Sequence, residues 1–191
     1  VQPVLDALAR DLGETVNMAS LESDRMIYVA QAASSHAMRM FTEIGRRVYC
    51  HSTGVGKAVL ATLPDDRVRA MAGRIGMPRQ TDRTIADIDS LLEDLALIRR
   101  RGYAIDEGEQ ELGVRCYAVA VPNTAVPTAL SVSGPAVRMT PELRKRAIPR
   151  LQQAACGLAE AMGSATVRHG ASTKKKRETE PLPEKAVKRG L

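Results

Sequence analysis

The stretch GYAIDEGEQELGVRCYAVAVPNTAVPTALSVSGP (residues 102–135) decides which fold class the sequence predicts. It holds two segments with strand-like alternation, residues 113–121 and 128–134, separated by the loop 122–127. A period of two places successive side chains on opposite faces of a sheet. Because a helix-like segment precedes the stretch and another follows it, we expect these strands to lie in a sheet that carries helices.

Small polar side chains occupy one face of these predicted strands, where core residues are expected. They are Cys116 in the first segment and Ser131 and Ser133 in the second, whose spacing puts both hydroxyls on one face. Just upstream, Asp106 directly follows the apolar run Tyr103–Ile105. This pattern predicts a buried pocket for a small polar ligand. The plain alternative is that the serine hydroxyls bond only to the backbone.

The rest of the chain supplies a hairpin and several amphipathic helices. The expected elements are a helix over residues 1–13, strands over 14–22 and 25–33, a third strand that includes Met38, Met40 and Thr42 and ends at Gly45, and helices over 51–63, 65–73, 85–101 and 140–162. Hairpin-type strands at both ends of this order predict an antiparallel sheet. The expected fold is therefore α+β, a GAF-like domain with a central antiparallel sheet flanked by helices.

The composition is that of one globular domain, and it argues against several classes of protein. The chain has 191 residues, 44% of them apolar, and no apolar run reaches the roughly 20 residues of a membrane span. One Phe, four Tyr and no Trp leave few aromatic platforms for stacking single-stranded nucleic acid. The three cysteines form no CxxC pair, which favours a reducing cytoplasm over a disulfide scaffold or a zinc site.

The formal net charge of +6 is concentrated at the C-terminal end. Residues 172–191 carry seven Lys or Arg against three Glu, which leaves the remainder of the chain at about +2. We expect residues 164–191 to be a charged, disordered tail behind a folded domain of residues 1–163. A basic DNA-binding face on the folded part is not indicated. The chain begins at Val1, in helix-like sequence without an initiator Met, and we expect it to be a fragment.

No motif predicts catalysis, a cofactor or a metal site. The segment Gly54–Lys57 is not a phosphate-binding P-loop, because His51 and Ala58 stand where that motif needs Gly and Ser or Thr. Its glycines are expected to permit close packing of a helix on the sheet, and the helix start also offers backbone N–H groups to an anion. His51 is expected to be structural, since no His or Cys stands at a metal-ligand spacing from it. Cys116 lies in an apolar strand, where a thiol pKa rises and nucleophilic catalysis is disfavoured.

Three segments in register carry a family resemblance. HSTGVGKAVLATLP (residues 51–64), GYAIDEGEQELGVRCYAVAVPN (102–123) and ALSVSGP (129–135) resemble the effector-binding domain of the isocitrate lyase regulator (IclR) family. Its members are bacterial transcription factors with an N-terminal winged helix-turn-helix and a C-terminal GAF-like domain. The resemblance covers residues 4–163. It implies a ligand-sensing domain whose small-molecule effector modulates DNA binding by a winged helix-turn-helix that is absent from this chain.

The resemblance also implies which residues contact the effector. In members that bind small carboxylates, the ligand lies between the Gly-containing helix start and the two C-terminal strands. The matching positions are the backbone amides of Gly54 and Val55, the acid Asp106, the thiol Cys116, the hydroxyls of Ser131 and Ser133, and an apolar wall of Ala37 and Met40. Such donors suit a buried carboxylate, which would cost many kcal/mol if it were left unpaired. Asp106 is then expected to accept a hydrogen bond from a ligand hydroxyl, a ligand amine or a pocket water.

Two other functions stay open at this point. A stand-alone GAF-like sensor or a small-molecule enzyme fits the same scaffold, and an enzyme would turn over the acid that a regulator only binds. In a third interpretation, the basic run Lys174–Arg177 of the tail binds nucleic acid. The family resemblance implies a homodimer or a dimer of dimers, which would match a palindromic operator. No membrane partner is expected.

Overall fold

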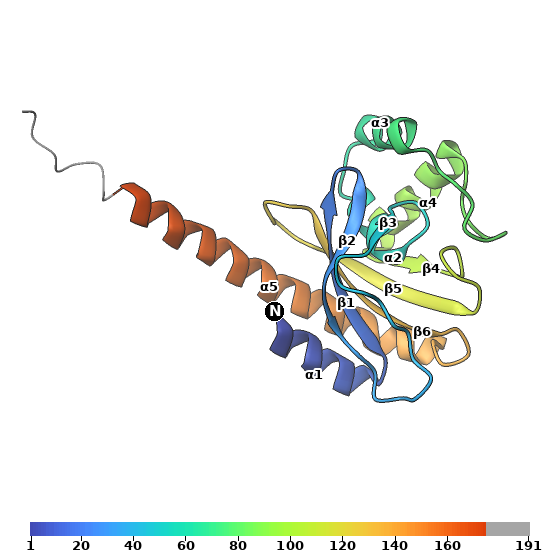
Figure 1. Cartoon of the computed structure of the whole chain (residues 1–191), viewed down its shortest axis with the longest axis horizontal. Coiled ribbons are helices and arrows are strands. Elements are labelled where there is room, and N and C mark those ends of the chain that lie inside the picture. Colours follow the sequence, from blue (N-terminus) through green and yellow to red (C-terminus); the bar gives the residue numbers. More distant parts are fainter. Residues whose placement is uncertain (175–191) are drawn as a thin grey trace, which may run out of the picture.

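The computed structural model describes residues 1–174 of the chain, with side chains through residue 162. Six strands of this part form one antiparallel sheet in the order β3-β2-β1-β6-β5-β4 (Figure 1). The strands are β1 (Thr15–Glu22), β2 (Arg25–Ala32), β3 (Arg47–Tyr49), β4 (Ala104–Asp106), β5 (Val114–Val121) and β6 (Thr128–Pro135). The antiparallel sheet that the hairpin signals predicted is confirmed.

Helices cover both faces of the sheet. On one face, α1 (Gln2–Leu12) and α5 (Pro141–Lys174) lie side by side, while the other face carries α2 (Gly54–Leu60), α3 (Asp65–Ile75) and α4 (Ile88–Arg101) (Figure 1). Each helical layer encloses its own hydrophobic core against the sheet. The expected α+β class, with helices flanking a central sheet, is therefore confirmed. Within the described part, every helix is too short or too polar to span a bilayer.

Strands β5 and β6 divide their side chains between these cores as their alternation predicted. Tyr117 and Val119 of β5 join the core under α1 and α5, together with Leu130 and Val132 of β6. Cys116 faces the core under α2 and α4. The polar face of the two strands is thus the face on which α2 lies.

The predicted third strand is wrong in position. Residues 33–46, including Met38 and Met40, form an irregular loop, and the strand that follows the hairpin is β3. The loop is held by side chains from distant elements: the Thr15 hydroxyl donates to the Met40 carbonyl (3.0 Å), and Arg138 Nη2 donates to the Met38 carbonyl (2.9 Å). The alternation of Met38, Met40 and Thr42 was accidental, because a short apolar alternation does not by itself provide a strand partner.

The last helix starts where its cap signal predicted but runs further than expected. The Thr140 hydroxyl accepts from the backbone N–H of Leu143 (3.2 Å), and α5 begins at Pro141. It extends to Lys174 instead of ending near Met162. Loss of apolar periodicity does not end a helix unless a breaker follows, and residues 163–174 contain no proline. From residue 175 on, the predicted disordered tail lies outside the described residues.

Candidate ligand-binding cavity

The register of the sheet lines up four polar side chains in one row across four strands. Thr15 of β1 pairs with Ser133 of β6, and Ser133 pairs in turn with Cys116 of β5. Cys116 then pairs with Asp106, the last residue of β4. All four residues are buried, with exposed fractions of 7% or less. A row of this kind provides hydroxyl, thiol and carboxyl groups inside the protein, next to a second row that carries Ser131 and Asn17.

A cavity of about 50 Å³ lies over this row. Its walls come from the loop 33–46, the start of α2 and the β4–β5 loop, and its lining residues are Tyr28, Met40, Phe41, Thr42, Arg46, Val48, Thr53, Gly54, Asp106, Gln110, Glu111, Val114, Cys116 and Ser133. One water needs roughly 10–15 Å³ of such space, so the cavity has room for a few waters. A larger ligand requires the exposed side of the cavity, where Phe41 is 75% exposed, to open.

The structure brings together five of the eight residues that were expected at the site. Met40, Gly54, Asp106, Cys116 and Ser133 line the cavity. The other three expected residues, Ala37, Val55 and Ser131, do not line the cavity.

Ala37 is exposed on the loop 33–46, three residues before Met40. Val55 is buried in the core beneath α2. Ser131 is buried one row further along the sheet, where it pairs with Ala118 of β5 and Asn17 of β1. The family resemblance placed these three residues at the site, but whether each one reaches the cavity depends on how its element packs.

The two glycines of α2 permit very close packing of this helix. A Cβ at Gly54 would lie 2.8 Å from Cys116 Sγ, and a Cβ at Gly56 would lie 2.3 Å from the carbonyl oxygen of Cys50. The expected packing of the helix on the sheet is therefore confirmed for Gly54, whereas Gly56 permits close packing against the turn that precedes the helix. Helix α2 is capped by Thr53, whose hydroxyl accepts from the Gly56 N–H (3.2 Å) and whose carbonyl accepts from the Lys57 N–H (2.9 Å). The amides of Gly54 and Val55 precede these first bonds of the helix.

Asp106 is a buried carboxyl group at the end of the row that lies on the edge strand β4. Burial raises its pKa to about 7, and the negative charge of Glu109 acts in the same direction. The backbone N–H of Glu109, which donates to Asp106 Oδ1 at 2.7 Å, and the charge of Lys57 oppose that rise in pKa. Near neutral pH this group is consequently present both as an acid, which can donate, and as a carboxylate, which only accepts.

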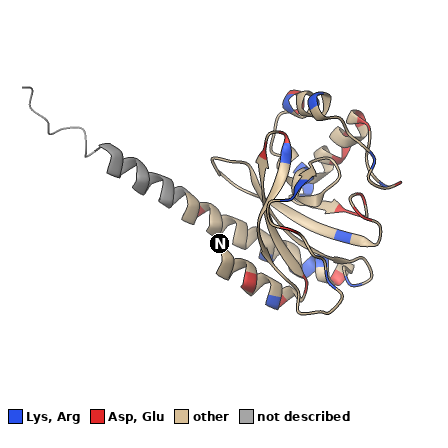
Figure 2. Cartoon of the chain, in the orientation of Figure 1, with Lys and Arg blue, Asp and Glu red and all other residues tan. Residues whose placement is uncertain are grey.

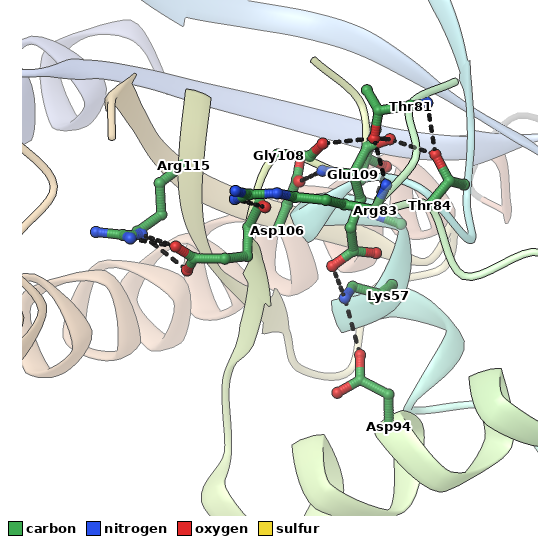
Figure 3. Close-up of polar contacts among 12 residues, drawn as sticks. Lys57, Thr81, Arg83, Thr84, Asp94, Asp106, Gly108, Glu109 and Arg115 are labelled. Carbon is green, nitrogen blue, oxygen red and sulfur yellow. Dashed lines mark hydrogen bonds and ion pairs between the residues drawn. The ribbon is translucent and has the colours of Figure 1, made fainter. Parts of the chain in front are cut away.

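Behind the cavity, Lys57 lies fully inside the protein between two carboxylates (Figure 3). Its Nζ is 2.6 Å from Glu109 Oε1 and 2.8 Å from Asp94 Oδ2, and its side chain is only 2% exposed. The second oxygen of Glu109 is buried without a hydrogen-bond partner. Burial raises the pKa of Glu109, while Lys57 acts to lower it. The sequence did not predict this cluster, since the partners of Lys57 are 37 and 52 residues away along the chain.

Two threonines of the loop between α3 and α4 hold the same segment from another side (Figure 3). Thr84 Oγ1 donates to the Glu109 carbonyl at 2.7 Å, and Thr81 Oγ1 donates to the Gly108 carbonyl at 2.7 Å. The short segment that follows Asp106 is thus fixed both through its backbone and through the Glu109 side chain.

The thiol and the imidazole near the cavity are not arranged for catalysis. Burial raises the pKa of Cys116 to about 12, and the Asp106 charge adds to this effect, so the thiol stays protonated at neutral pH. His51 is buried, with Nε2 3.1 Å from the carbonyl oxygen of Pro78, and burial lowers its pKa. Its packing agrees with the structural role that the sequence predicted.

Several polar side chains of the lining were not predicted as site residues, among them Tyr28 and Arg46. Tyr28 of β2 reaches the cavity, and burial raises the pKa of its phenol. Arg46 lies at the cavity mouth on an exposed turn, and no carboxylate of residues 1–162 is within ion-pair distance of it. Nothing in the local sequence distinguishes Arg46 from its neighbour Arg47, which pairs with Glu22.

Comparison with known protein families shows the family to which the chain belongs. Residues 1–159 match the family described as "Bacterial transcriptional regulator IclR C-terminal". The chain belongs to this family. Among curated relatives, it is 35% identical over 161 residues to the regulator KdgR of Dickeya chrysanthemi, covering 83% of this chain and 52% of that protein. It is 39% identical over 144 residues to the transcriptional repressor IclR of Escherichia coli K12, covering 73% and 53%. The chain thus spans about half the length of these relatives.

Solved structures of IclR-family proteins have the same fold. The C-terminal domain of E. coli KdgR superposes with a TM-score of 0.75 at 32% identity, covering 84% of this chain and 94% of that one. The inducer-binding domain of an Acinetobacter PobR double mutant, solved as a complex with 3-hydroxybenzoic acid, gives a TM-score of 0.75 at 27% identity, with 83% and 94% covered. A domain of this fold has thus been solved with a small aromatic acid.

Proposed function

We propose that this IclR-family domain binds a small organic acid in the cavity over the Thr15–Ser133–Cys116–Asp106 row, and that binding modulates DNA attachment by a winged helix-turn-helix domain outside this chain. The observation that carries the proposal is the row itself. It places three buried polar groups, those of Ser133, Cys116 and Asp106, along the floor of one cavity, and Thr15 continues the row on β1. The inducer-binding domain of PobR, with its bound hydroxybenzoic acid, supports the choice of an acid.

The carboxylate of the effector is proposed to lie at the start of α2. Gly54 lines the cavity there, and its amide precedes the first hydrogen bonds of the helix. The hydroxyl of Ser133 supplies a further donor from the floor. At the mouth, the guanidinium of Arg46 attracts anions from solvent, and it has no competing carboxylate partner among the described side chains.

Asp106 is proposed to read the other polar group of the effector. As a carboxylate it accepts from a ligand hydroxyl or amine, and as an acid it donates to a ligand oxygen. The apolar walls from Met40, Phe41 and Val48 fit the carbon skeleton between the two polar ends. Ala37, Val55 and Ser131 are proposed to act indirectly, through the loop, helix and strand that carry them.

Binding without turnover is favoured over catalysis. An enzyme on this scaffold would need an activated nucleophile or a base, whereas the Cys116 thiol is protonated and the His51 ring is turned toward Pro78. The curated relatives are named as transcriptional regulators. Lys and Arg positions are interspersed with Asp and Glu positions along the described part of the chain (Figure 2), a pattern that does not favour a concentrated basic DNA-binding face there.

The output is proposed to require more than this chain. A ligand regulates only if it favours one of two arrangements of the DNA-binding domains. We propose a homodimer or a dimer of dimers as the working unit, acting in the cytoplasm on a palindromic operator. The basic run at Lys174–Arg177 is proposed to take no part in sequence-specific DNA binding.

A thermal-shift screen against metabolic and aromatic carboxylates tests the proposal. A ligand that binds only the native state stabilises it by RT ln(1 + L/Kd), where L is the free ligand concentration, and the melting temperature therefore rises with ligand concentration. We expect at least one small acid to raise it, and the same acid to be recovered unchanged after long incubation. Turnover of the acid would contradict the regulatory role, and the absence of any shift would contradict the cavity assignment.

A further inference from the structure

One buried ammonium group and three carboxyl groups form a chain of contacts that begins at Asp106, in the lining of the cavity, and leads away from the cavity. The chain of contacts runs from Asp106, through the backbone N–H and then the side chain of Glu109, to Lys57, and ends at Asp94 of α4. The side chains of Lys57, Asp106 and Glu109 are nine-tenths buried or more. Figure 3 shows Lys57 on the side of Glu109 that is away from Asp106, with Asp94 beyond it.

The charges of this group do not balance. Asp94 is partly exposed and is also paired with Arg101 (3.9 Å from Nη2 to Oδ1), so the imbalance lies at Asp106 and Glu109, which share the single buried ammonium of Lys57. Two buried carboxylates at close range do not both ionise freely, because each disfavours the charged form of the other. The unpartnered Oε2 of Glu109 shows that the protein supplies no further donor to relieve the excess charge.

We propose that the Lys57–Glu109 pair is a positioning unit for the cavity: it fixes the segment that carries Asp106 and sets whether Asp106 meets the effector as a hydrogen-bond donor or as a carboxylate. The inference rests on the proposed role of the cavity as an effector site. Neither Lys57 nor Glu109 lines that cavity, so each acts through Asp106.

The effector class follows from this arrangement. An anionic ligand placed beside an ionised Asp106 would be repelled, whereas the protonated acid can donate to it. Binding of a carboxylate ligand is therefore accompanied by uptake of a proton by Asp106. The affinity of the cavity for monocarboxylates is consequently higher in weakly acidic solution. A neutral or amine-bearing ligand is not accompanied by proton uptake.

Other charged and titratable groups also face Asp106, and they belong in the pH argument. They are Cys116 from β5, Tyr28 from β2, Arg46 at the mouth and Glu111 on the β4–β5 loop. The thiol and the phenol stay neutral across the relevant pH range, since burial raises the pKa of both. Lys57 and Glu109 are consequently the buried charges whose removal should shift the titration of Asp106 in opposite directions.

The test follows the titration of the Asp106 carboxyl carbon by NMR in the ligand-free wild-type domain and in variants of Glu109, Lys57 and Asp94. In Glu109→Gln, which keeps the size of the side chain and its contact with Lys57, the midpoint is expected to fall by roughly one pH unit. In Lys57→Met, loss of the cation is expected to raise it. Because that variant leaves the buried carboxylate of Glu109 without its cation and can fail to fold, the double variant K57M/E109Q serves in its place, with an Asp106 midpoint expected above that of Glu109→Gln.

Asp94→Asn is the matched control, since Asp94 contacts Lys57 on the side away from Asp106. Its midpoint is expected to move less than that of Glu109→Gln. If the Lys57–Glu109 ion pair only stabilised the fold, the variants would lose stability, but the midpoints of the Asp106 titration would not follow the order predicted above. An unchanged or raised midpoint in Glu109→Gln would overturn the proposal.

A second arm measures acetate binding to the wild-type domain by calorimetry between pH 5 and 8, in carboxylate-free buffers of different ionisation enthalpy. We expect proton uptake on binding, and affinity that falls at least tenfold as the pH rises through the Asp106 midpoint. In Glu109→Gln that fall is expected at lower pH. Acetate binding without proton uptake would overturn the inference. If acetate does not bind but the midpoints shift in the expected order, the positioning role stands and the proposed carboxylate effector fails.

Discussion

Gly54, at the start of α2, lies directly over Cys116 of β5, so that a Cβ added at Gly54 would fall 2.8 Å from the thiol sulfur. This contact sets how close the helix start comes to the polar row of the sheet. We predict that Gly54→Ala pushes Cys116 into the cavity and abolishes ligand-induced thermal shifts, while circular dichroism still shows the native fold. Retained shifts in this variant would place the ligand elsewhere.

Gly56 is predicted to matter for stability. Its added Cβ would lie 2.3 Å from the Cys50 carbonyl oxygen, which is backbone and cannot easily move. We expect Gly56→Ala to lower the free energy of unfolding by more than about 2 kcal/mol in urea titrations. Gly73→Ala in α3 is the matched control, because nothing lies within 4 Å of its added Cβ. That variant is expected to gain about 0.5–1 kcal/mol from helix propensity.

Asp106 is predicted to make the stability of the domain depend on pH. Burial raises the pKa of Asp106 from 3.8 to about 7, so the folded state holds this proton more tightly than the unfolded state does. Its contribution therefore falls as the pH rises from about 4 to about 7. Asp106→Asn removes that loss, and we expect it to be more stable than wild type by roughly 2–4 kcal/mol at pH 8.

Urea unfolding of both proteins at pH 4.5 and pH 8 measures this difference, which should shrink toward the lower pH. Glu93→Gln, which changes an exposed carboxylate of α4, is expected to differ from wild type by only a few tenths of a kcal/mol at either pH. An Asp106→Asn variant that is less stable at pH 8 would refute the assignment of a buried, costly carboxylate.

Arg46 is predicted to attract the anionic effector. We expect Arg46→Gln to weaken carboxylate binding by about 0.5–1 kcal/mol at low salt, because the group is exposed at the mouth. The difference should vanish near 1 M salt, where exposed charges are screened. Arg47→Gln is the control, since Arg47 is paired with Glu22 and does not line the cavity. Equal effects of both variants would show that only the overall charge matters.

Local signals in the sequence predicted most of the fold. The turn between β1 and β2 is an example, because Ser23 and Asp24 take the positive φ values of 48° and 65° that a tight hairpin turn needs. Gly102 ends α4 in the left-handed conformation, as its position indicated. The polar face of β5 and β6 was likewise readable, since it depends on a period of two within each strand.

What the sequence did not predict depends on contacts between distant residues. The loop 33–46 looks like a strand locally, but Thr15 and Arg138 hold it in its irregular path. In the sequence, Lys57 lies in a segment that only partly matches a phosphate-binding P-loop. Its side chain can be buried because Glu109 and Asp94, from other elements, form ion pairs with it. The family resemblance pointed to β5 and β6, while the register of the sheet decides which of their residues face the cavity.

The central claim is that a small acid binds over the Ser133–Cys116–Asp106 row, and calorimetry with the acid that gives the largest thermal shift tests it most directly. Ser133→Ala removes a hydroxyl from the cavity floor, and we predict that it weakens binding by roughly 1–3 kcal/mol through an unpaired ligand oxygen. Ser131→Ala, one row further along the sheet, is expected to weaken binding less. Unchanged affinity in a folded Ser133→Ala variant would contradict the account.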